Sequence, residues 1–114
     1  MTSIYKVLSK GAWTEAQASG VFRGAPVDIA DGFIHFSTGA QVAETVAKHF
    51  AGHADLIVLT VDAATLGAAL KWEESRGGAL FPHLYAPLAL SHVLDARPLP
   101  LGVDGRHDFT GLLP

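Results

Sequence analysis

The feature that most constrains the fold is an almost unbroken hydrophobic run at residues 55–61. It reads Asp-Leu-Ile-Val-Leu-Thr-Val, with no alternation between apolar and polar residues. A strand with one solvated face would alternate, whereas a strand covered on both faces is continuously apolar. The run therefore predicts a central strand, and the rest of the chain must cover both faces of its sheet.

Shorter segments around this strand predict an α+β fold. Capping-box spacings followed by glycine predict helices over 14–19 and 39–51, and a stretch rich in Gly, Pro and Asp predicts a loop at 23–32. β-forming residues between turn signals predict further strands at 4–8, 33–36, 70–73, 80–85 and 88–96. Both main helices precede the late strands, an order typical of α+β proteins rather than doubly wound ones.

The length of 114 residues fits one domain. We expect residues 1–97 to form it. Residues 98–114 hold three of the six prolines and are expected to form an irregular C-terminal tail.

Composition excludes several functional classes. The net charge is −3, and the eight Lys and Arg residues are scattered, so the basic stripe required for duplex nucleic-acid binding is missing. The absence of cysteine excludes disulfide frameworks, thiol nucleophiles and zinc fingers. The apolar runs are far shorter than the roughly 20 residues of a membrane span, and no signal-peptide core opens the sequence. We expect a cytoplasmic protein without a membrane partner; its oligomeric state stays open.

The first candidate site lies at residues 33–38, Phe-Ile-His-Phe-Ser-Thr, where a strand leads into a capped helix. Polar groups at such a junction are well placed to bind anions or small ligands, which points to His35 and Ser37. The alternative is a structural His35 that hydrogen-bonds a backbone carbonyl. Spacing alone does not decide between the two.

The second candidate lies at residues 81–85, Phe-Pro-His-Leu-Tyr. Alternation places Phe81, His83 and Tyr85 on one face, where they could stack a planar ring and hydrogen-bond its edge. The alternative is an edge strand, because Pro82 and Pro87 cannot donate to a neighbouring strand.

The third candidate is the segment 72–76, Trp-Glu-Glu-Ser-Arg, which precedes a glycine pair. Glu73 could orient a hydroxyl or act as a base, and Arg76 could bind a phosphate. A solvated turn is the alternative. His49 and His53 have the i, i+4 spacing of a helical metal site but lack the glutamate of the zincin motif, so no metal is expected.

Several motifs occur in a recognisable order: Ile-Tyr-Lys at 4–6, Gly-Phe-Ile-His-Phe-Ser at 32–37, Lys-Trp-Glu at 71–73 and Phe-Pro-His-Leu-Tyr at 81–85. Together they resemble the bacterial family catalogued as domain of unknown function 952, over residues 3 to about 95. That family resembles the ADP-ribosyltransferase fold, in particular the RNA 2′-phosphotransferase-like branch. The resemblance implies a split, bent mixed or antiparallel sheet around a cleft of the size of NAD.

The resemblance implies that the candidate residues line one cleft. It assigns catalytic roles to His35, Glu73 and His83, and ligand-binding roles to Lys6, Ser37, Trp72, Arg76 and Tyr85. Lys6 stands where the related branch has a histidine.

The expected function is binding of NAD or another nucleotide-type ligand, with ADP-ribosyl or phosphate transfer as the chemistry. A fold alone does not determine a reaction, so two alternatives stay open. One is a non-catalytic ligand-binding or interaction module with a degenerate cleft. The other is a metal-dependent hydrolase that uses His35, His83 and Glu73 as ligands.

Overall fold

The computed structural model describes residues 2–113, apart from the side chain of Arg76. Its strands and helices, in chain order, are β1 (Ser3–Ser9), α1 (Lys10–Ser19), β2 (Val21–Phe22), α2 (Pro26–Asp31), β3 (Ile34–His35), β4 (Ser37–Thr38), α3 (Val42–His49), β5 (Leu56–Asp62), β6 (Leu70–Glu74), β7 (Leu80–Leu84), β8 (Leu88–Ala89) and β9 (Val93–Leu99). Short 3₁₀ segments lie at Ala63–Ala69, Arg76–Gly78 and Leu90–His92. All strand pairs in this part of the chain are antiparallel, which confirms the α+β class.

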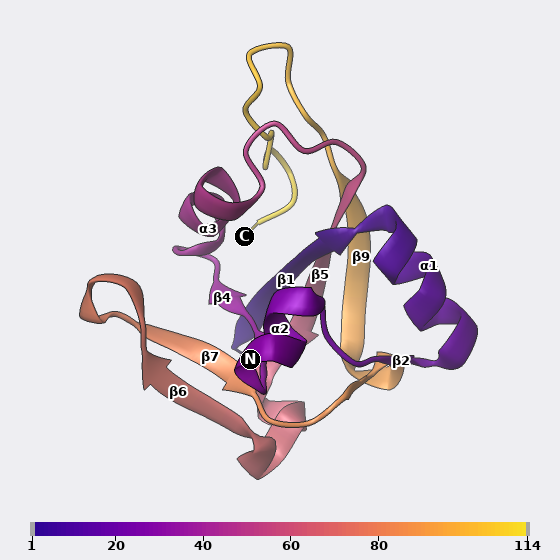
Figure 1. Ribbon diagram of the computed structural model, residues 1–114, viewed down its shortest axis with the longest axis vertical. Coiled ribbons are helices and arrows are strands. Elements are labelled where there is room, and N and C mark those ends of the chain that lie inside the picture. Colours follow the sequence, from indigo (N-terminus) through magenta and orange to yellow (C-terminus); the bar gives the residue numbers. More distant parts are fainter. Residues whose placement is uncertain (1, 114) are drawn as a thin grey trace.

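The largest sheet has the strand order β4-β1-β5-β9 and contains the predicted central strand (Figure 1). In β5, Leu56 to Leu59 are at most 8% exposed, so both faces are covered. Leu59 packs in a core cluster with α1 residues, and Val58 packs in a second cluster with α3 residues. The continuous hydrophobic run is therefore explained by two cores, one on each side of the sheet.

A second sheet has the order β3-β7-β6 and carries both histidine motifs. Its register places Ile34 opposite Leu84 and His35 opposite His83. Because β7 is paired on both sides, the edge-strand interpretation of residues 80–85 is wrong. Pro82 is accommodated within this central strand, and its carbonyl accepts a hydrogen bond of 3.0 Å from the N–H of Phe36.

The first helix begins earlier than predicted. Ser9, rather than Thr14, is the N-cap residue of α1, and its hydroxyl oxygen accepts a 3.1 Å hydrogen bond from the N–H of Ala12. Thr14 lies inside the helix and donates its hydroxyl to the carbonyl of Lys10. The helix ends at Gly20 as predicted, with φ of 81°.

The predicted loop at 23–32 contains the helix α2. The described residues therefore form three α-helices, one more than the two main helices predicted. Pro26 occupies the first turn, where its missing N–H costs nothing and its fixed φ suits the helix. Gly32 ends the helix in the left-handed region, with φ of 86°. The same Pro and Gly that indicated a loop therefore delimit a short helix.

The helix α3 is shorter than the predicted 39–51. Thr38 belongs to β4, although its N–H still donates to the side-chain oxygen of Gln41 at 3.0 Å. His53 lies beyond the end of α3, so His49 and His53 are not one helical turn apart. The carbonyl of His53 instead accepts a 2.7 Å hydrogen bond from Nε2 of His107.

The C-terminal segment folds back over the molecule. β9 extends to Leu99, past the predicted domain boundary at residue 97, and Leu101 forms an isolated bridge with His107. Phe109, Leu112 and Leu113 then pack against the core cluster on the α3 side of the large sheet. Figure 1 shows this segment, in yellow, beside α3.

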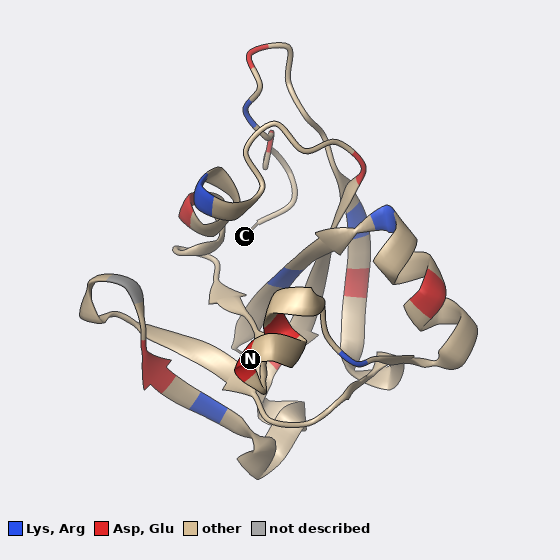
Figure 2. Ribbon diagram, in the orientation of Figure 1, with Lys and Arg blue, Asp and Glu red and all other residues tan. Residues whose placement is uncertain are grey.

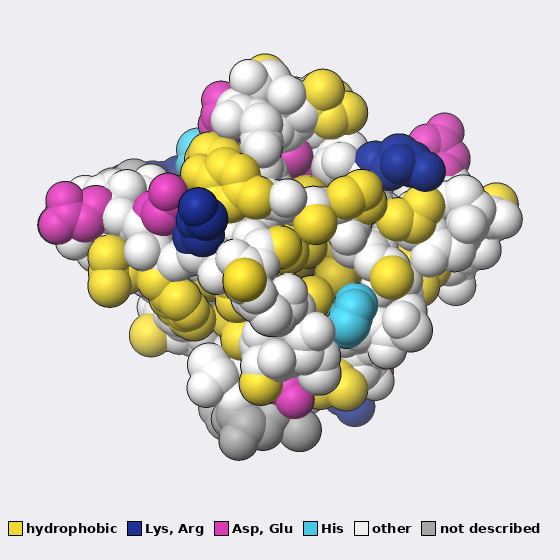
Figure 3. Space-filling model, turned by 90° about the horizontal axis from the view of Figure 1, so that it is seen from below, with side chains coloured by type: hydrophobic (Ala, Val, Ile, Leu, Met, Phe, Trp, Pro, Cys, Tyr) yellow, Lys and Arg dark blue, Asp and Glu magenta, His cyan; other side chains and the backbone are white. Residues whose placement is uncertain are grey.

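The surface carries charges of both signs. Lys and Arg residues are spread over several elements with acidic residues between them (Figure 2). Seen from below, the middle of this face is mainly hydrophobic or neutral, and most acidic and basic groups lie around it (Figure 3). Residues 2–113 contain no helix that is long and apolar enough to cross a membrane.

Candidate functional site

A cleft of about 630 Å³ lies where the two larger sheets meet. Its walls come from β1, α2, the β3–β4 segment, α3 and β7. Four residues predicted for the site line it: Lys6, His35, Ser37 and His83. Its apolar lining includes Val27, Val42, Phe50 and Phe81. A cavity of this size with a few converging polar groups is typical of small-ligand sites.

His35 is held by two carboxylates. Its Nδ1 lies 2.6 Å from Oδ1 of Asp28, and its Nε2 lies 3.0 Å from Oδ2 of Asp31. The Asp28 side chain is 1% exposed, whereas that of Asp31 is 48% exposed. The expected alternative partner, a backbone carbonyl, is replaced by these carboxylates.

Asp28 is the best-satisfied polar group of the site. Its carboxylate accepts hydrogen bonds from the N–H of Ala25 at 2.7 Å, the N–H of His35 at 3.1 Å and the Nδ1 of His35. Nζ of Lys6 lies 3.0 Å from Oδ1 and 2.9 Å from Oδ2 of the same carboxylate. Burying a carboxylate is costly unless such donors surround it, so Asp28 joins β1, α2 and β3.

The charges of this cluster alter two pKa values. Burial raises the pKa of Asp28, but the hydrogen bond from His35, the charge and hydrogen bond of Lys6 and the N–H of Ala25 outweigh it and lower the value to about 2. Burial also lowers the pKa of Lys6, although Asp28 opposes that shift. Lys6 and Asp28 thus form a buried ion pair, in which the carboxylate compensates the charge of the ammonium.

His83 is held by a carboxylate of its own. Its Nδ1 lies 2.8 Å from Oε1 of Glu73, and the hydroxyl of Tyr85 donates to the same oxygen at 2.6 Å. These two donors, Tyr85 first, lower the pKa of Glu73. The hydrogen bond to Glu73 in turn raises the pKa of Tyr85. Glu73 and Tyr85 therefore orient the ring of His83 from outside the cleft and do not line the cleft themselves.

Phe33 packs against both histidines. Its ring is stacked on His83 at 4.1 Å between centroids, with an interplanar angle of 23°, and lies 4.5 Å from His35. The two imidazoles are 5.5 Å apart, in an edge-on arrangement. Tyr85 lies 5.2 Å from Phe33, so its ring is already in contact with the protein. The ring stacked on His83 is therefore that of Phe33.

The remaining predicted residues occupy different places. Ser37 is buried, and its hydroxyl is 3.1 Å from that of Thr45 in the first turns of α3. Trp72 lies opposite Pro82 on the other face of β6 from Glu73 and does not line the cleft. The side chain of Arg76 lies outside the described residues.

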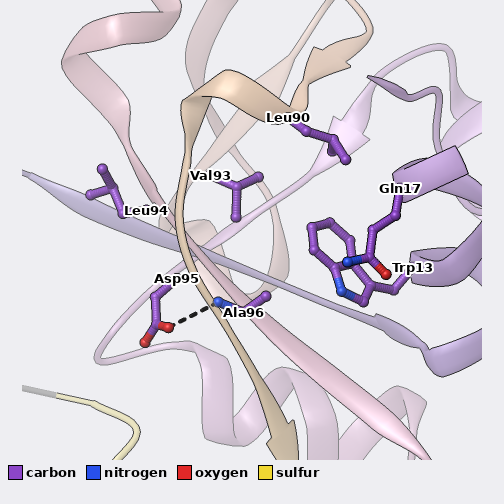
Figure 4. Close-up of a pocket in the computed structure, with 7 residues that line it drawn as sticks. All are labelled: Trp13, Gln17, Leu90, Val93, Leu94, Asp95 and Ala96. Atoms are coloured by element: carbon purple, nitrogen blue, oxygen red, sulfur yellow. Dashed lines mark hydrogen bonds between the residues drawn. The ribbon is translucent and has the colours of Figure 1, made fainter. Parts of the chain in front are cut away.

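A second hollow, of about 520 Å³, lies between α1 and β9. Trp13 and Gln17 point from α1 toward Val93 and Ala96, and the Asp95 carboxylate accepts a hydrogen bond from the N–H of Ala96 (Figure 4). None of the predicted site residues whose side chains the structure describes lines this hollow. Its one carboxylate is also paired with Arg97, so it offers few converging polar groups compared with the histidine cleft.

The His, Asp and Glu side chains of the described residues are candidate metal ligands. Within residues 2–113, no group of three or more His, Asp and Glu side chains is placed to hold a metal ion. In the set expected for a hydrolase, Nδ1 of His35 contacts Asp28, whereas Nδ1 of His83 contacts Glu73.

The residues missed by sequence reasoning are Asp28, Asp31, Phe33 and Thr45. Asp31 precedes His35 by four residues, and Asp28 lies in the first turn of a helix that starts with Pro26, where acidic residues are favoured. Recognising that helix would have drawn attention to Asp28 as its acidic first-turn residue, but it would not have revealed the contacts of either carboxylate with His35. Phe33 lay in the quoted motif, but nothing in its spacing indicated stacking on His83.

Fold and site together define a small α+β protein whose antiparallel sheets frame a histidine-lined cleft. The chain belongs to the family described as protein of unknown function (DUF952), which matches residues 7–96. The family part of the resemblance is thereby confirmed.

Solved structures of a relative share this fold. The crystal structure of protein CC0527 from Caulobacter crescentus is 53% identical in sequence, with a TM-score of 0.93 over 96% of each chain. The solution structure of CC0527 gives a TM-score of 0.88 at 53% identity, covering 99% of this chain and 97% of that one. No curated protein matches the chain significantly.

Proposed function

We propose that the cleft binds a nucleotide-type ligand, such as NAD, and that the protein transfers an ADP-ribosyl or phosphate group. One observation carries this proposal: two histidines, each with Nδ1 on a carboxylate, are cross-strand neighbours in one cleft. A carboxylate on Nδ1 fixes the ring, and in His83 it leaves Nε2 for a reacting group, the arrangement used in general acid–base catalysis. Nε2 of His35 instead lies 3.0 Å from the Asp31 carboxylate. The resemblance to the ADP-ribosyltransferase fold suggests the ligand class.

His83 is the proton-transfer group in this proposal. Its Nε2 accepts the proton of an attacking hydroxyl or water while that oxygen forms a bond to the phosphorus or to the ribose carbon. The leaving group departs with the electron pair of the broken bond. Glu73 orients the ring and stabilises the imidazolium that forms.

The rest of the cleft provides ligand contacts of two kinds. Phe50 and Phe81 give an apolar wall for a planar ring, and the imidazole of His35 gives a polar group for a phosphate or ribose. Ser37 adds a hydroxyl at the start of the next element. Such a mixture of apolar and polar lining suits a nucleotide better than a purely ionic ligand.

The test is ligand binding followed by variants of the histidine pair. NAD, ADP-ribose and adenine nucleotides at millimolar concentration should raise the melting temperature by the amount expected from linkage. His83→Ala should abolish turnover, and Glu73→Gln should lower it, whereas His92→Ala, outside the cleft, is the matched control. If none of these ligands binds, the proposal is wrong.

A second candidate is a non-catalytic binding module, and the Lys6–Asp28 pair favours it. The resemblance implies that Lys6 stands at the position of a histidine in the related branch. The charge of its ammonium is compensated by Asp28. A lysine cannot both donate and accept as a neutral imidazole does. The variant Lys6→His tests whether this one replacement accounts for a lost activity. A gain of NAD binding or turnover would indicate an enzyme disabled at this position. No gain would show that the replacement at Lys6 is not the explanation.

A further inference from the structure

His35 contacts two carboxylates that differ in exposure, and Asp31 is the more exposed of the two. Asp28 holds Nδ1 from inside the protein, and Asp31, the last residue of α2, lies 3.0 Å from Nε2 at the cleft. His35 and Asp31, the two partners of this Nε2 contact, both line the cleft. The inner carboxylate is 1% exposed and the outer one 48% exposed.

These two contacts differ in how readily they break. A neutral imidazole carries a single N–H, so both contacts are hydrogen bonds only when both ring nitrogens are protonated. Removing Asp28 would strand a buried ammonium and several donors, whereas an exposed ion pair such as that of Asp31 contributes little and is readily exchanged for another anion. Nε2 is therefore the donor that a ligand can capture.

We propose that Nε2 of His35 is a phosphate subsite and that the Asp31 carboxylate occupies the place of the ligand's phosphate until the ligand displaces it. In terms of the proposed function, on which this inference rests, the phosphate is that of the nucleotide-type ligand. One phosphate oxygen accepts the Nε2 proton, and the Asp31 side chain turns toward solvent. Asp28 stays in place and keeps the ring oriented.

A competing carboxylate has a measurable consequence. Asp31→Asn removes both the competitor and a negative charge that repels phosphate, so affinity should rise by about two- to fivefold, the size expected for one exposed charge pair. The gain should appear for inorganic phosphate and for adenosine monophosphate. It should be absent for adenosine, which has no phosphate. A purely structural Asp31 would give no such distinction.

The experiment titrates wild type, Asp31→Asn and Asp31→Ala with these three ligands by calorimetry. Glu15→Gln on α1, which removes the same charge from an exposed residue outside the cleft, is the control. Nitrogen shifts of the His35 ring, measured by NMR, should move in both Asp31 variants and on addition of phosphate to wild type.

Tighter phosphate and monophosphate binding in both Asp31 variants, with Glu15→Gln like wild type, supports the subsite. Unchanged phosphate affinity in both variants, or no phosphate binding by any of the proteins, overturns it. If phosphate binding improves but no nucleotide binds more tightly than phosphate alone, the subsite stands and the proposed nucleotide function fails. If nucleotides bind and the Asp31 variants change nothing, the reverse holds.

Discussion

Replacing Asp28 by Asn tests whether the buried carboxylate organises the cleft. The amide keeps the shape of the side chain but removes the charge that compensates Lys6, a residue that is only 6% exposed. The pKa of Asp28 falls from 3.8 to about 2, and at about 1.4 kcal/mol per unit this corresponds to about 2 kcal/mol of stability. Breaking a buried ion pair costs roughly 3–5 kcal/mol. We therefore expect Asp28→Asn to lose about 2–4 kcal/mol of unfolding free energy.

Urea unfolding followed by the fluorescence of Trp13 and Trp72 measures this loss. Asp31→Asn is a matched control, because it makes the same substitution on the other carboxylate of His35 and differs mainly in exposure. It should lose less than about 1 kcal/mol. A loss below about 1 kcal/mol in Asp28→Asn itself would refute the argument that burial makes this carboxylate essential.

The same contribution should depend on acid. The folded-state pKa of Asp28 is depressed, so its stabilisation is complete above the unfolded value of 3.8 and is lost as the pH falls through about 2. The difference in unfolding free energy between wild type and Asp28→Asn should accordingly shrink between pH 4 and about pH 2. A difference that stays constant over this range would show that the charge of Asp28 is not its source.

Three further changes have defined outcomes. Leu59→Ala, at a fully buried position of β5, should lose roughly 2–5 kcal/mol in urea unfolding through lost burial and a cavity. Glu73→Gln should leave the urea midpoint nearly unchanged but bring the raised pKa of Tyr85 back toward its ordinary value, as ultraviolet titration of the phenolate would show. Gly24→Ala should cost more than about 1 kcal/mol, because φ there is 120° and the new Cβ would lie 2.9 Å from the Cβ of Asp28; an unchanged melting temperature would contradict this.

The sequence predicted the large elements of the fold because their hydrophobic patterns are long. The continuous run at 55–61 favoured a strand covered on both faces, and β5 is one. The short helix α2 was missed because six residues bounded by Pro26 and Gly32 resemble a loop when only composition is considered. Helix boundaries failed where two capping residues compete, as at Ser9 and Thr14.

The candidate site was predictable in part. His35 and His83 stood in recognisable motifs, and the register that makes them neighbours follows from β3 pairing with β7, which short strands do not reveal in advance. Asp28 could not be found in this way, because its importance comes from burial and from Lys6, 22 residues earlier in the chain. Trp72 was assigned to the cleft from its motif, but alternation along β6 turns it to the other face.

The C-terminal segment has a consequence for where this protein can be shortened. The segment packs against the core cluster that contains Tyr5, Val7 and Val42, and these three residues also line the histidine cleft. The family match ends at residue 96, before the Phe109–Leu113 segment that provides this cover. A chain trimmed to the family boundary would thus keep every histidine of the site and still lose the support behind one wall of the cleft. The C-terminal segment therefore supports the wall of the cleft by packing against the core behind it.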